Sequence, residues 1–306
     1  MDNPTPAKQG RAGMVAVVGR TNVGKSTLLN RILEEKVSIV SPVAQTTRKL
    51  IRAILTEPRG QLVFVDTPGL HKTTEQLGHL MNRMARSAVQ GVDTVLLVVD
   101  GSSPPRQEDE GWIQRLVADK TPCLVALNKA DVPHAYEDVY KKVWAEKAAE
   151  KQSNLQATWL SVSALKGDGV NRLVDALFQL VPEGPHLFPD DMLTDYPRKL
   201  NMADIIREKL FAVLKDEIPY SIGVEVESIA ERPEGWSAEA NIYADKSSHK
   251  PIIIGHKGRV LRNVRRAAEA ELTEMYGKPV TLNLWVKVEK KWIKNYWILR
   301  KLGYME

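Results

Sequence analysis

A glycine-rich segment near the start of the chain has the residue types and spacing that bind phosphate. Gly19 and Gly24 bracket it, and Lys25 and Ser26 follow at the start of an expected helix over residues 26–33. Glycines let backbone N–H groups approach phosphate oxygens, and the N-terminus of a helix favours negative charge. The pattern predicts a nucleoside triphosphate site, in which Lys25 neutralises the β- and γ-phosphates and Ser26 binds Mg²⁺.

A second motif, Asn128-Lys-Ala-Asp131, identifies the base. The Asp131 carboxylate can accept hydrogen bonds from N1–H and the exocyclic amine of guanine, a pattern that adenine does not offer. Asn128 would hold the purine edge and support the loop, while the stem of Lys129 covers one ring face. A site built on such bonds rejects the wrong base because buried polar groups are then left unpaired. The structural alternative is a turn closed by side-chain hydrogen bonds.

A third motif, Ser161-Val-Ser-Ala164, completes the expected base pocket. The backbone N–H of Ala164 would donate to guanine O6, with Ser163 and Leu165 beside it. We therefore expect the ligands to be GTP and GDP. Three further residues of the phosphate loop are expected to contact the nucleotide: Asn22, Val23 and Thr27.

Two segments could report the state of the nucleotide. Asp66 follows an expected strand and begins Asp66-Thr-Pro-Gly69, so it can reach Mg²⁺ through water, while the Gly69 N–H senses the γ-phosphate. In the segment 41–48, the Thr47 hydroxyl is preferred over that of Thr46 to complete the magnesium shell. Both segments are expected to become disordered after hydrolysis.

Leu70 follows Gly69, at a place where many GTPases have a glutamine that orients water. A leucine cannot position water, so intrinsic hydrolysis should be slow unless another element acts. Asn22 in the phosphate loop could help to hold K⁺ against the phosphates, where the cation would act as an arginine finger does.

The elements that position these motifs alternate along the chain. Apolar runs predict strands at 14–18, 62–65, 94–99, 123–127 and 158–162, and amphipathic stretches predict helices at 26–33, 76–89, 107–117, 137–149 and 169–180. Continuous apolarity indicates strands buried on both faces. The fold class is therefore α/β, a doubly wound sheet that binds its ligand at the carboxyl ends of the strands.

A different site is indicated near the C-terminus, where apolar residues 252–254 lead into Gly255-His-Lys-Gly258. Two glycines let a nucleic-acid backbone approach closely, and the helix that follows presents its N-terminus to phosphates. Candidate cationic contacts are His256, Lys257, Arg259, Arg262, Arg265 and Arg266. The pattern is typical of a KH module, which binds single-stranded RNA.

Helix 198–214, strands 221–230 and 237–244, helix 259–276, strand 279–288 and a short terminal helix surround that loop. Within strand 279–288, Trp285 lies on the polar side. It could stack on a base, or pack beneath the terminal helix with Trp292 or Trp297; packing is slightly favoured.

With 306 residues the chain is long enough for two cores. We expect a nucleotide domain at 1–181, a proline-containing linker at 182–197 and a smaller α+β KH domain of type II at 198–306. Charge supports this division: residues 185–245 carry a net −7, whereas residues 246–306 carry +9, which suits a phosphate backbone.

Several classes of protein are excluded. Cys123 is the single cysteine and lies in an apolar run, so a packed thiol is expected and a disulfide is impossible. The histidines lack the spacing of a zinc site. No apolar run reaches the ~18 residues of a membrane span, and the polar start is unlike a secretory signal. We expect a cytoplasmic protein, acting as a monomer.

The combination of motifs closely resembles the Era family, bacterial GTPases with a C-terminal KH domain. The resemblance rests on residues 19–30, Ala44-Gln-Thr-Thr-Arg48, Asp66-Thr-Pro-Gly-Leu-His71, residues 254–258 and Leu284-Trp-Val-Lys-Val288. It implies binding to the 3′ end of 16S rRNA and a role in assembly of the 30S ribosomal subunit. Two departures are Thr21, where proline is common, and the basic, aromatic stretch 289–297.

Two alternatives stay open. The basic C-terminal surface could contact anionic lipid, which would make the chain a peripheral GTPase at the cytoplasmic face of the cell membrane, regulating growth or the cell cycle. A tRNA-modification GTPase would share the catalytic site without glutamine, but should lack the KH signature.

Overall fold

The structure, a computed structural model, describes residues 10–43, 46–73, 75–133 and 135–305. The chain forms two compact units. The first comprises the residues up to Ser38 together with Thr47–Asp195, and the second comprises Ile39–Thr46 and Tyr196–Glu306. The second unit therefore takes a short segment from an early part of the chain.

The first unit is built on a mostly parallel sheet with the strand order β2-β3-β1-β4-β5-β6. Strand β2 is antiparallel to β3, whereas the other neighbours on this path are parallel. The bounds are β1 (Gly10–Val18), β2 (Ile51–Glu57), β3 (Gly60–Asp66), β4 (Thr94–Asp100), β5 (Cys123–Asn128) and β6 (Thr158–Ser161).

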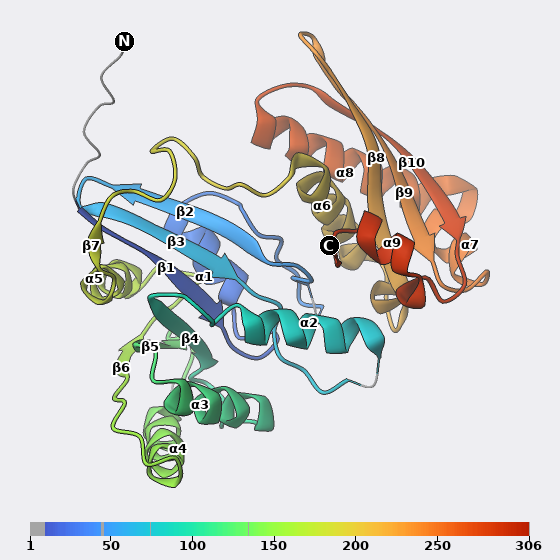
Figure 1. Cartoon of the computed structure of the whole chain (residues 1–306). Helices are drawn as coiled ribbons and strands as arrows, with labels where there is room; N and C mark the ends of the chain where they lie inside the picture. Colours follow the sequence, from blue (N-terminus) through green and yellow to red (C-terminus); the bar gives the residue numbers. More distant parts are fainter. Residues whose placement is uncertain (1–9, 44–45, 74, 134, 306) are drawn as a thin grey trace, which may run out of the picture. The chain divides into compact units, whose positions relative to one another are not determined.

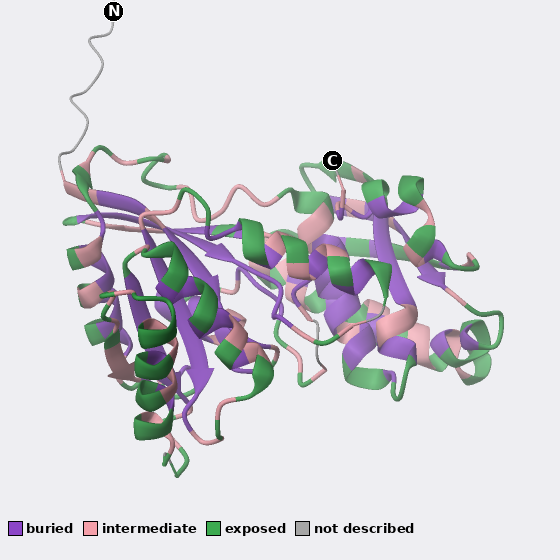
Figure 2. Cartoon of the chain, turned by 60° about the horizontal axis from the view of Figure 1, so that its bottom comes forward, coloured by how far each residue is buried: buried purple, intermediate pink, exposed green. Residues whose placement is uncertain are grey.

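Helices cover both faces of this sheet (Figure 1). Alternate side chains of β1 enter different cores: Val15 and Val17 pack with α1 (Lys25–Leu33) and α5 (Val170–Leu180). Ala16 and Val18 lie in a second core formed with α2 (Gln76–Ser87), α3 (Gln107–Asp119) and α4 (Glu137–Glu150). The strands are buried and the outward sides of the helices are exposed (Figure 2). The predicted doubly wound α/β domain is confirmed.

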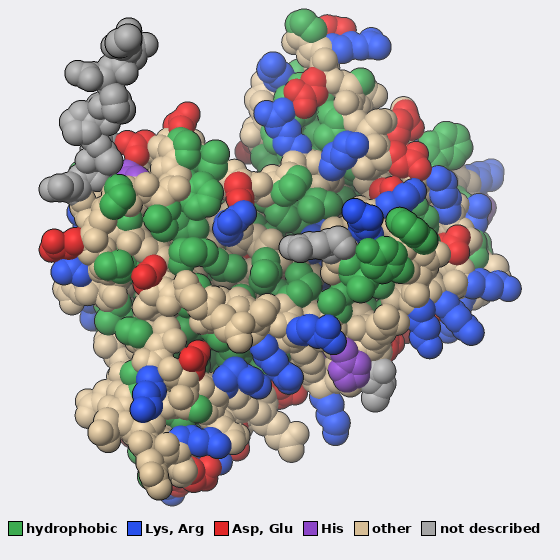
Figure 3. All heavy atoms as spheres, viewed as in Figure 1, with side chains coloured by type: hydrophobic (Ala, Val, Ile, Leu, Met, Phe, Trp, Pro, Cys, Tyr) green, Lys and Arg blue, Asp and Glu red, His purple; other side chains and the backbone are tan. Residues whose placement is uncertain are grey.

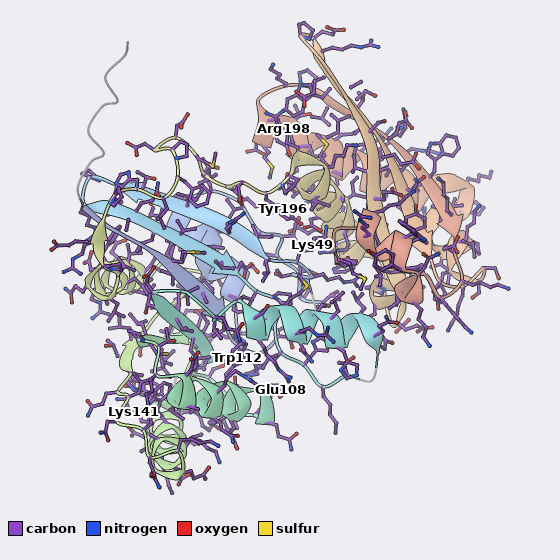
Figure 4. The ribbon with its side chains drawn as sticks, viewed as in Figure 1. Lys49, Glu108, Trp112, Lys141, Tyr196 and Arg198 are labelled. Atoms are coloured by element: carbon purple, nitrogen blue, oxygen red, sulfur yellow. The ribbon has the colours of Figure 1, made fainter. Side chains whose placement is uncertain are left out.

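Trp112 and Cys123 are two buried side chains of the second core. Trp112 of α3 is fully buried and packs with residues of β4 and β5 (Figure 4). Cys123 of β5 is 3% exposed, and burial raises the pKa of its thiol to about 12. The prediction of a packed, unreactive thiol is confirmed.

Strand β2 was not predicted from the sequence. Ile51 and Ala53 are buried around an exposed Arg52, but Ile54 is buried as well, which interrupts the alternation. The Ile54 N–H donates to the carbonyl of Leu193, so residues far along the chain cover this strand. Periodicity within the strand could not show that.

The expected linker, 182–197, is ordered along the first unit as far as Asp195. Strand β7 (Glu183–Gly184) pairs with β1 in antiparallel fashion. The Gln61 side chain accepts from the backbone N–H groups of Leu187 and Phe188, at 2.8 and 2.9 Å. These bonds give the segment a fixed path on the sheet.

The second unit has a three-stranded sheet in the order β10-β9-β8, with β8 antiparallel and β10 parallel to β9. Helices α6 and α8 contribute to one core with the sheet. The elements follow as α6 (Arg198–Val213), β8 (Ile222–Arg232), β9 (Gly235–Ala244), α7 (His249–Ile254), α8 (Arg259–Tyr276), β10 (Val280–Val288) and α9 (Tyr296–Lys301). The order is therefore α-β-β-α-α-β-α, in which α7 was not predicted from the sequence and the other elements were.

The short segment Ile39–Thr46, just before Thr47, belongs to this second unit. Ile39 is 3% exposed within its core, and the Val40 N–H donates to Glu208 Oε1 at 2.8 Å. Arg207 Nη2 donates to the carbonyl of Thr46 at 2.6 Å. The buried Arg207 is itself fixed by other residues of the unit, with Asp204 at 3.2 Å and the Tyr304 hydroxyl at 3.0 Å.

In the described ranges, no helix is both long enough and apolar enough to cross a membrane.

Candidate functional site

The glycine-rich loop lies between the end of β1 and the start of α1, at the carboxyl edge of the sheet. Gly19 has φ +148°, and a Cβ there would lie 2.3 Å from the carbonyl oxygen of Val98. Gly24 has φ +97°, and its Cβ would lie 2.3 Å from Asn128 Nδ2. Both positions therefore require glycine, for the backbone angle and for the close approach.

Lys25 lies inside this loop. Its Nζ donates to the carbonyl oxygens of Gly19 and Arg20, at 3.1 and 2.9 Å. Burial lowers the pKa of Lys25 to about 8, against the opposing effect of the Asp66 charge. A phosphate group beside Nζ would stabilise the ammonium form far better than two carbonyls do.

Three side-chain oxygen atoms that could bind a metal ion lie close together next to Lys25. Ser26 Oγ lies 2.9 Å from Thr47 Oγ1 and 2.9 Å from Asp66 Oδ2. Asp66 is fully buried, burial raises the pKa of its carboxyl, and its Oδ1 has no hydrogen-bond partner in the described residues. A buried carboxylate with a spare oxygen, beside two hydroxyls, fits the hard oxygen ligands that Mg²⁺ prefers.

The two candidate threonines face different ways. Thr47 Oγ1 is at Ser26, whereas Thr46 Oγ1 donates to the carbonyl of Val43 at 2.6 Å. The structure therefore places Thr47, and not Thr46, beside the oxygen atoms of Ser26 and Asp66. Among the described residues, no group of three or more His, Cys, Asp and Glu side chains could hold a metal ion.

The segment after Asp66 lies against the phosphate loop. A Cβ on Gly69 would come within 2.7 Å of Thr21 Cα, and the Leu70 N–H donates to the carbonyl of Gly19 at 3.4 Å. The Leu70 side chain is 7% exposed and packs in the core that includes α3. It thus has no polar atom to orient water and is turned into the protein. Asn22, in the loop, has φ +61°.

The base motif is joined to both neighbouring loops through Asn128. Its Nδ2 donates to the carbonyl of Val23 at 2.7 Å, and its Oδ1 accepts from the Ala164 N–H at 2.9 Å. The Ala164 N–H, which the sequence motif assigned to guanine O6, thus donates to Asn128 in the structure. Asn128 therefore holds the phosphate loop and the third motif in one arrangement.

Asp131 is held ready to accept hydrogen bonds. Ser163 Oγ donates to Asp131 Oδ1 at 2.6 Å, and this bond is the main reason why the pKa of Asp131 is lowered. The carboxylate therefore stays ionised. Leu165, which follows the third motif, is 67% exposed.

A buried cluster of charges behind the phosphate loop was not predicted from the sequence. Asp100 Oδ2 lies 2.7 Å from Lys129 Nζ and 3.3 Å from Arg20 Nη2, and Arg20 Nε lies 3.0 Å from the fully buried Asp109. Hydrogen bonds from Lys129 and Ser102 outweigh burial and lower the pKa of Asp100 to about 2. One signal was present in the sequence: a carboxylate ends the apolar run of β4.

The second candidate site begins where α7 ends. Gly255 has φ +73° and ψ 170°, and a Cβ there would lie 2.4 Å from Val260 Cγ2. Gly258 has φ +74°, but its Cβ would meet only Arg262 Nη2, at 3.9 Å. Arg262 also donates to the carbonyl of Lys257 at 3.0 Å, so the loop is fixed onto α8.

The candidate cations His256, Lys257, Arg259, Arg262 and Arg266 are exposed, and Arg265 is half-buried. Beside this loop lies a groove of about 260 Å³. Its walls are the first turns of α8 and the edge strand β10, and its lining residues are Gly258, Leu261, Arg262, Arg265, Asn283, Leu284 and Trp285.

Trp285 lines this groove and is 63% exposed. The favoured prediction, that Trp285 packs beneath the terminal helix, is therefore wrong. Trp292 does pack there: it is fully buried, and its Nε1 donates to the carbonyl of Ser221 at 2.8 Å. Strand alternation places Trp285 on the polar side of β10, away from the core residues Val286 and Leu282.

Two family models match the chain. One, described as 50S ribosome-binding GTPase, matches residues 14–129, and the other, described as KH domain, matches residues 217–293. These ranges cover the loops of the first unit through Lys129 and most of the second unit.

Curated relatives match over nearly the whole chain. The GTPase Era of Caldanaerobacter subterraneus subsp. tengcongensis is 45% identical over 296 residues, covering 96% of this chain and 98% of the relative. The GTPase Era of Thermoanaerobacter sp. (strain X514) is 43% identical over 297 residues, covering 96% of both.

Two solved structures are similar in fold over 97% of this chain and all of the other, at 36% identity. One is a point variant of Aquifex aeolicus Era bound to GDP.AlF4⁻, with a TM-score of 0.88. The other is Era in complex with MgGDPNP and nucleotides 1506–1542 of 16S ribosomal RNA, with a TM-score of 0.89.

Proposed function

This chain belongs to the Era family of GTPases, and on that premise we propose that it binds the 3′ end of 16S rRNA and acts in assembly of the 30S ribosomal subunit. The observation that carries the proposal is the groove beside Gly258, lined by arginines and an exposed tryptophan. The related Era in complex with 16S rRNA nucleotides supports the choice of RNA. Ribosomal subunits assemble in the cytoplasm, where we place the protein.

The first unit supplies GTP hydrolysis. The γ-phosphate would replace the carbonyl contacts of Lys25, whose charge then offsets that of the phosphates. Ser26, Thr47 and Asp66 would hold Mg²⁺, which neutralises the charge on the β- and γ-phosphate oxygens. The Gly69 backbone lies close enough to the phosphate loop to respond to the γ-phosphate.

Water must be oriented by something other than the residue after Gly69, because the Leu70 side chain packs in the core. We propose that K⁺, held with the help of Asn22, adds positive charge at the phosphates in the transition state. Phosphoryl transfer is accelerated mainly by electrostatic stabilisation of this kind, together with positioning of the reactants.

Guanine is selected by the base motif and the third motif, which Asn128 joins to the phosphate loop. The ionised Asp131 carboxylate accepts from the guanine edge, and the stem of Lys129, fixed by Asp100, covers a face of the ring. Adenine would leave the Asp131 carboxylate facing no N1–H, which is costly in a desolvated pocket.

The second unit supplies RNA binding. The loop 255–258 brings the RNA backbone close to main-chain N–H groups, and the exposed cations of α8 neutralise phosphates. The groove is large enough for a nucleobase, and the Trp285 ring at its wall offers a stacking surface. RNA capture and release would then follow the nucleotide state of the first unit.

Gly258 provides the sharper test of this proposal. Its Cβ would meet only the end of a flexible arginine, so Gly258→Asn and Gly258→Asp should both fold, at a cost of about 1 kcal/mol for the left-handed backbone. The Asp variant adds a negative charge where phosphate binds, whereas Asn is its neutral control. Gly255→Asp is less informative, because its Cβ collides with Val260 and distorts the loop.

The assay is crosslinking in cells followed by sequencing of bound RNA, with GTP affinity measured in parallel. We expect reads at the 3′ end of 16S rRNA for the wild type and for Gly258→Asn, and their loss for Gly258→Asp, with GTP affinity unchanged in all three. Diffuse reads that are insensitive to Gly258→Asp would refute the proposal.

A further inference from the structure

Residues 289–301 carry five basic side chains, one acidic side chain and three aromatic side chains. The groove beside Gly258 is lined by other residues. The part of this segment that faces solvent is therefore a charged and aromatic surface to which the proposed function assigns no role.

One aromatic side chain anchors the segment. Trp292 is fully buried against β8, where a Cβ on Gly223 would lie 3.1 Å from its ring. Asn295 then caps α9, its Oδ1 accepting from the N–H groups of Trp297 at 3.0 Å and Ile298 at 3.3 Å. Ile298 and Leu299 are buried, so the inward face of α9 is fixed.

The other two aromatic side chains point outward. Tyr296 is 46% exposed and Trp297 is 66% exposed, and their rings meet edge to face with centroids 5.4 Å apart. An exposed tryptophan on an anchored helix loses little conformational entropy when it binds, because its backbone is already ordered. Aromatic side chains are enriched at interaction surfaces relative to the rest of a protein surface.

Cations surround the aromatic pair. Lys290, Lys291, Lys294, Arg300 and Lys301 are all exposed, and within the described ranges the ion pair seen here joins Lys301 to Glu225 at 3.7 Å. Figure 3 shows hydrophobic side chains at the surface over α9, with Lys and Arg side chains around them. We call these five cations, with Tyr296 and Trp297, the α9 surface.

We infer that the α9 surface is a second RNA contact, which binds nucleotides flanking those held in the groove. An unpaired base would stack on Trp297, while the lysines contact the phosphates on either side of it. This inference rests on the proposed function, because the groove must hold the same RNA. Once one part of a strand is held, its neighbouring nucleotides are at a high local concentration, so even weak contacts add to affinity.

RNA fits the α9 surface better than a lipid membrane does. An interfacial helix needs a long apolar face opposite its cations, whereas α9 has six residues and buries Ile298 and Leu299 in its own unit. Stacking of a base needs only one exposed ring with positive charge beside it, which is what Trp297 and the neighbouring lysines offer.

The test compares two RNAs in fluorescence-anisotropy titrations of the full-length protein. One is an RNA of nucleotides 1506–1542 of 16S rRNA, and the other is a fragment of it, about six nucleotides long, that fills the groove alone. The variants are Trp297→Ala, Lys294→Glu and Gly258→Asp, and Val213→Ala is the control for removal of an exposed apolar side chain elsewhere in the unit.

Trp297→Ala should weaken binding of the long RNA about tenfold and leave the short RNA unchanged, as expected for one lost stacking contact. Lys294→Glu should also weaken binding of the long RNA and make its affinity depend less on salt concentration. Equal affinity of wild type and Trp297→Ala for the long RNA, while Gly258→Asp still abolishes binding, would overturn this inference but keep the proposed function. If Gly258→Asp binds normally, the proposed function fails. Flotation with anionic vesicles that depends on Trp297, without an effect on RNA, would also overturn the inference in favour of lipid.

Discussion

Replacing Asp100 by asparagine tests whether one carboxylate holds the phosphate loop and the base loop together. Asp100 Oδ2 pairs with Arg20, next to Gly19, and with Lys129, next to Asn128. Asparagine keeps the shape and can still accept a hydrogen bond, but it removes the charge that faces both cations. The variant should therefore be less stable and bind guanine nucleotides more weakly.

The expected loss of stability follows from the lowered pKa of Asp100. Asp100 has its pKa lowered to about 2 from 3.8, so its stabilising effect is fully present above pH 4 and is lost as the pH falls through about 2. The shift corresponds to roughly 2 kcal/mol. Because the Lys129 side chain is 38% exposed, solvent screens part of this, and we expect about 1–2 kcal/mol at pH 7. For a unit of this size the Tm should fall by about 2–8 °C.

The assay combines thermal unfolding with the dissociation rate of a fluorescent GDP analogue at pH 7. Loss of the ion pair that fixes Lys129 should speed dissociation about fivefold, the equivalent of about 1 kcal/mol. Asp175→Asn is the matched control, because it breaks a surface ion pair with Arg59 whose side chains are 55% and 44% exposed. If Asp100→Asn behaves like this control in both measurements, the two loops are not held through Asp100.

Three further outcomes are expected at the nucleotide site. Because Lys25 has a pKa of about 8 and phosphate favours its charged form, GDP binding at pH 8 should take up about half a proton, measured by calorimetry in two buffers of different ionisation enthalpy. Uptake should be close to zero at pH 6, and absent at pH 8 in Lys25→Arg; equal uptake in both proteins would contradict the assignment. Asp131→Asn should weaken GTP binding at least tenfold and improve binding of xanthine nucleotides, which a competition titration detects; unchanged GTP affinity would remove Asp131 from the base site. GTP turnover should be faster in K⁺ than in Na⁺ buffer, and Asn22→Ala should abolish the difference, whereas equal rates in both salts would remove the basis for a potassium site.

The sequence predicted those parts of the nucleotide site that depend on local spacing. The loop that leads to Lys25 and Ser26 follows β1, and Asn128 ends β5. Because these parallel strands end at the same edge of the sheet, the meeting of these residues in space needs only the doubly wound topology. The charge cluster was missed because Arg20, Asp100 and Asp109 belong to three separate segments. Nothing within any one of them shows that the others are near.

Strand β10 shows the limit of periodicity. Alternation correctly separated Trp285 from the core-facing Val286, but it did not decide what lay over the polar side. The buried ring proved to be that of Trp292, because Gly223 of β8 leaves room for it. The space for this ring is left by a glycine about 70 residues earlier in the chain, and the alternation within β8 or β10 does not reveal it.

The segment Ile39–Thr46 has a consequence for the order in which the protein can fold. Thr46 and the arginine that binds its carbonyl are separated by 161 residues, so a ribosome that has just made the first unit has not yet made Arg207 or the rest of α6. At that stage the residues that bury Ile39 have not been made, and the segment that precedes Thr47 has none of its contacts with the second unit. The segment Ile39–Thr46 can therefore reach its final packing only when the second unit has been synthesised, and a fragment cut at Asp195 would leave Ile39 and Thr46 without these partners.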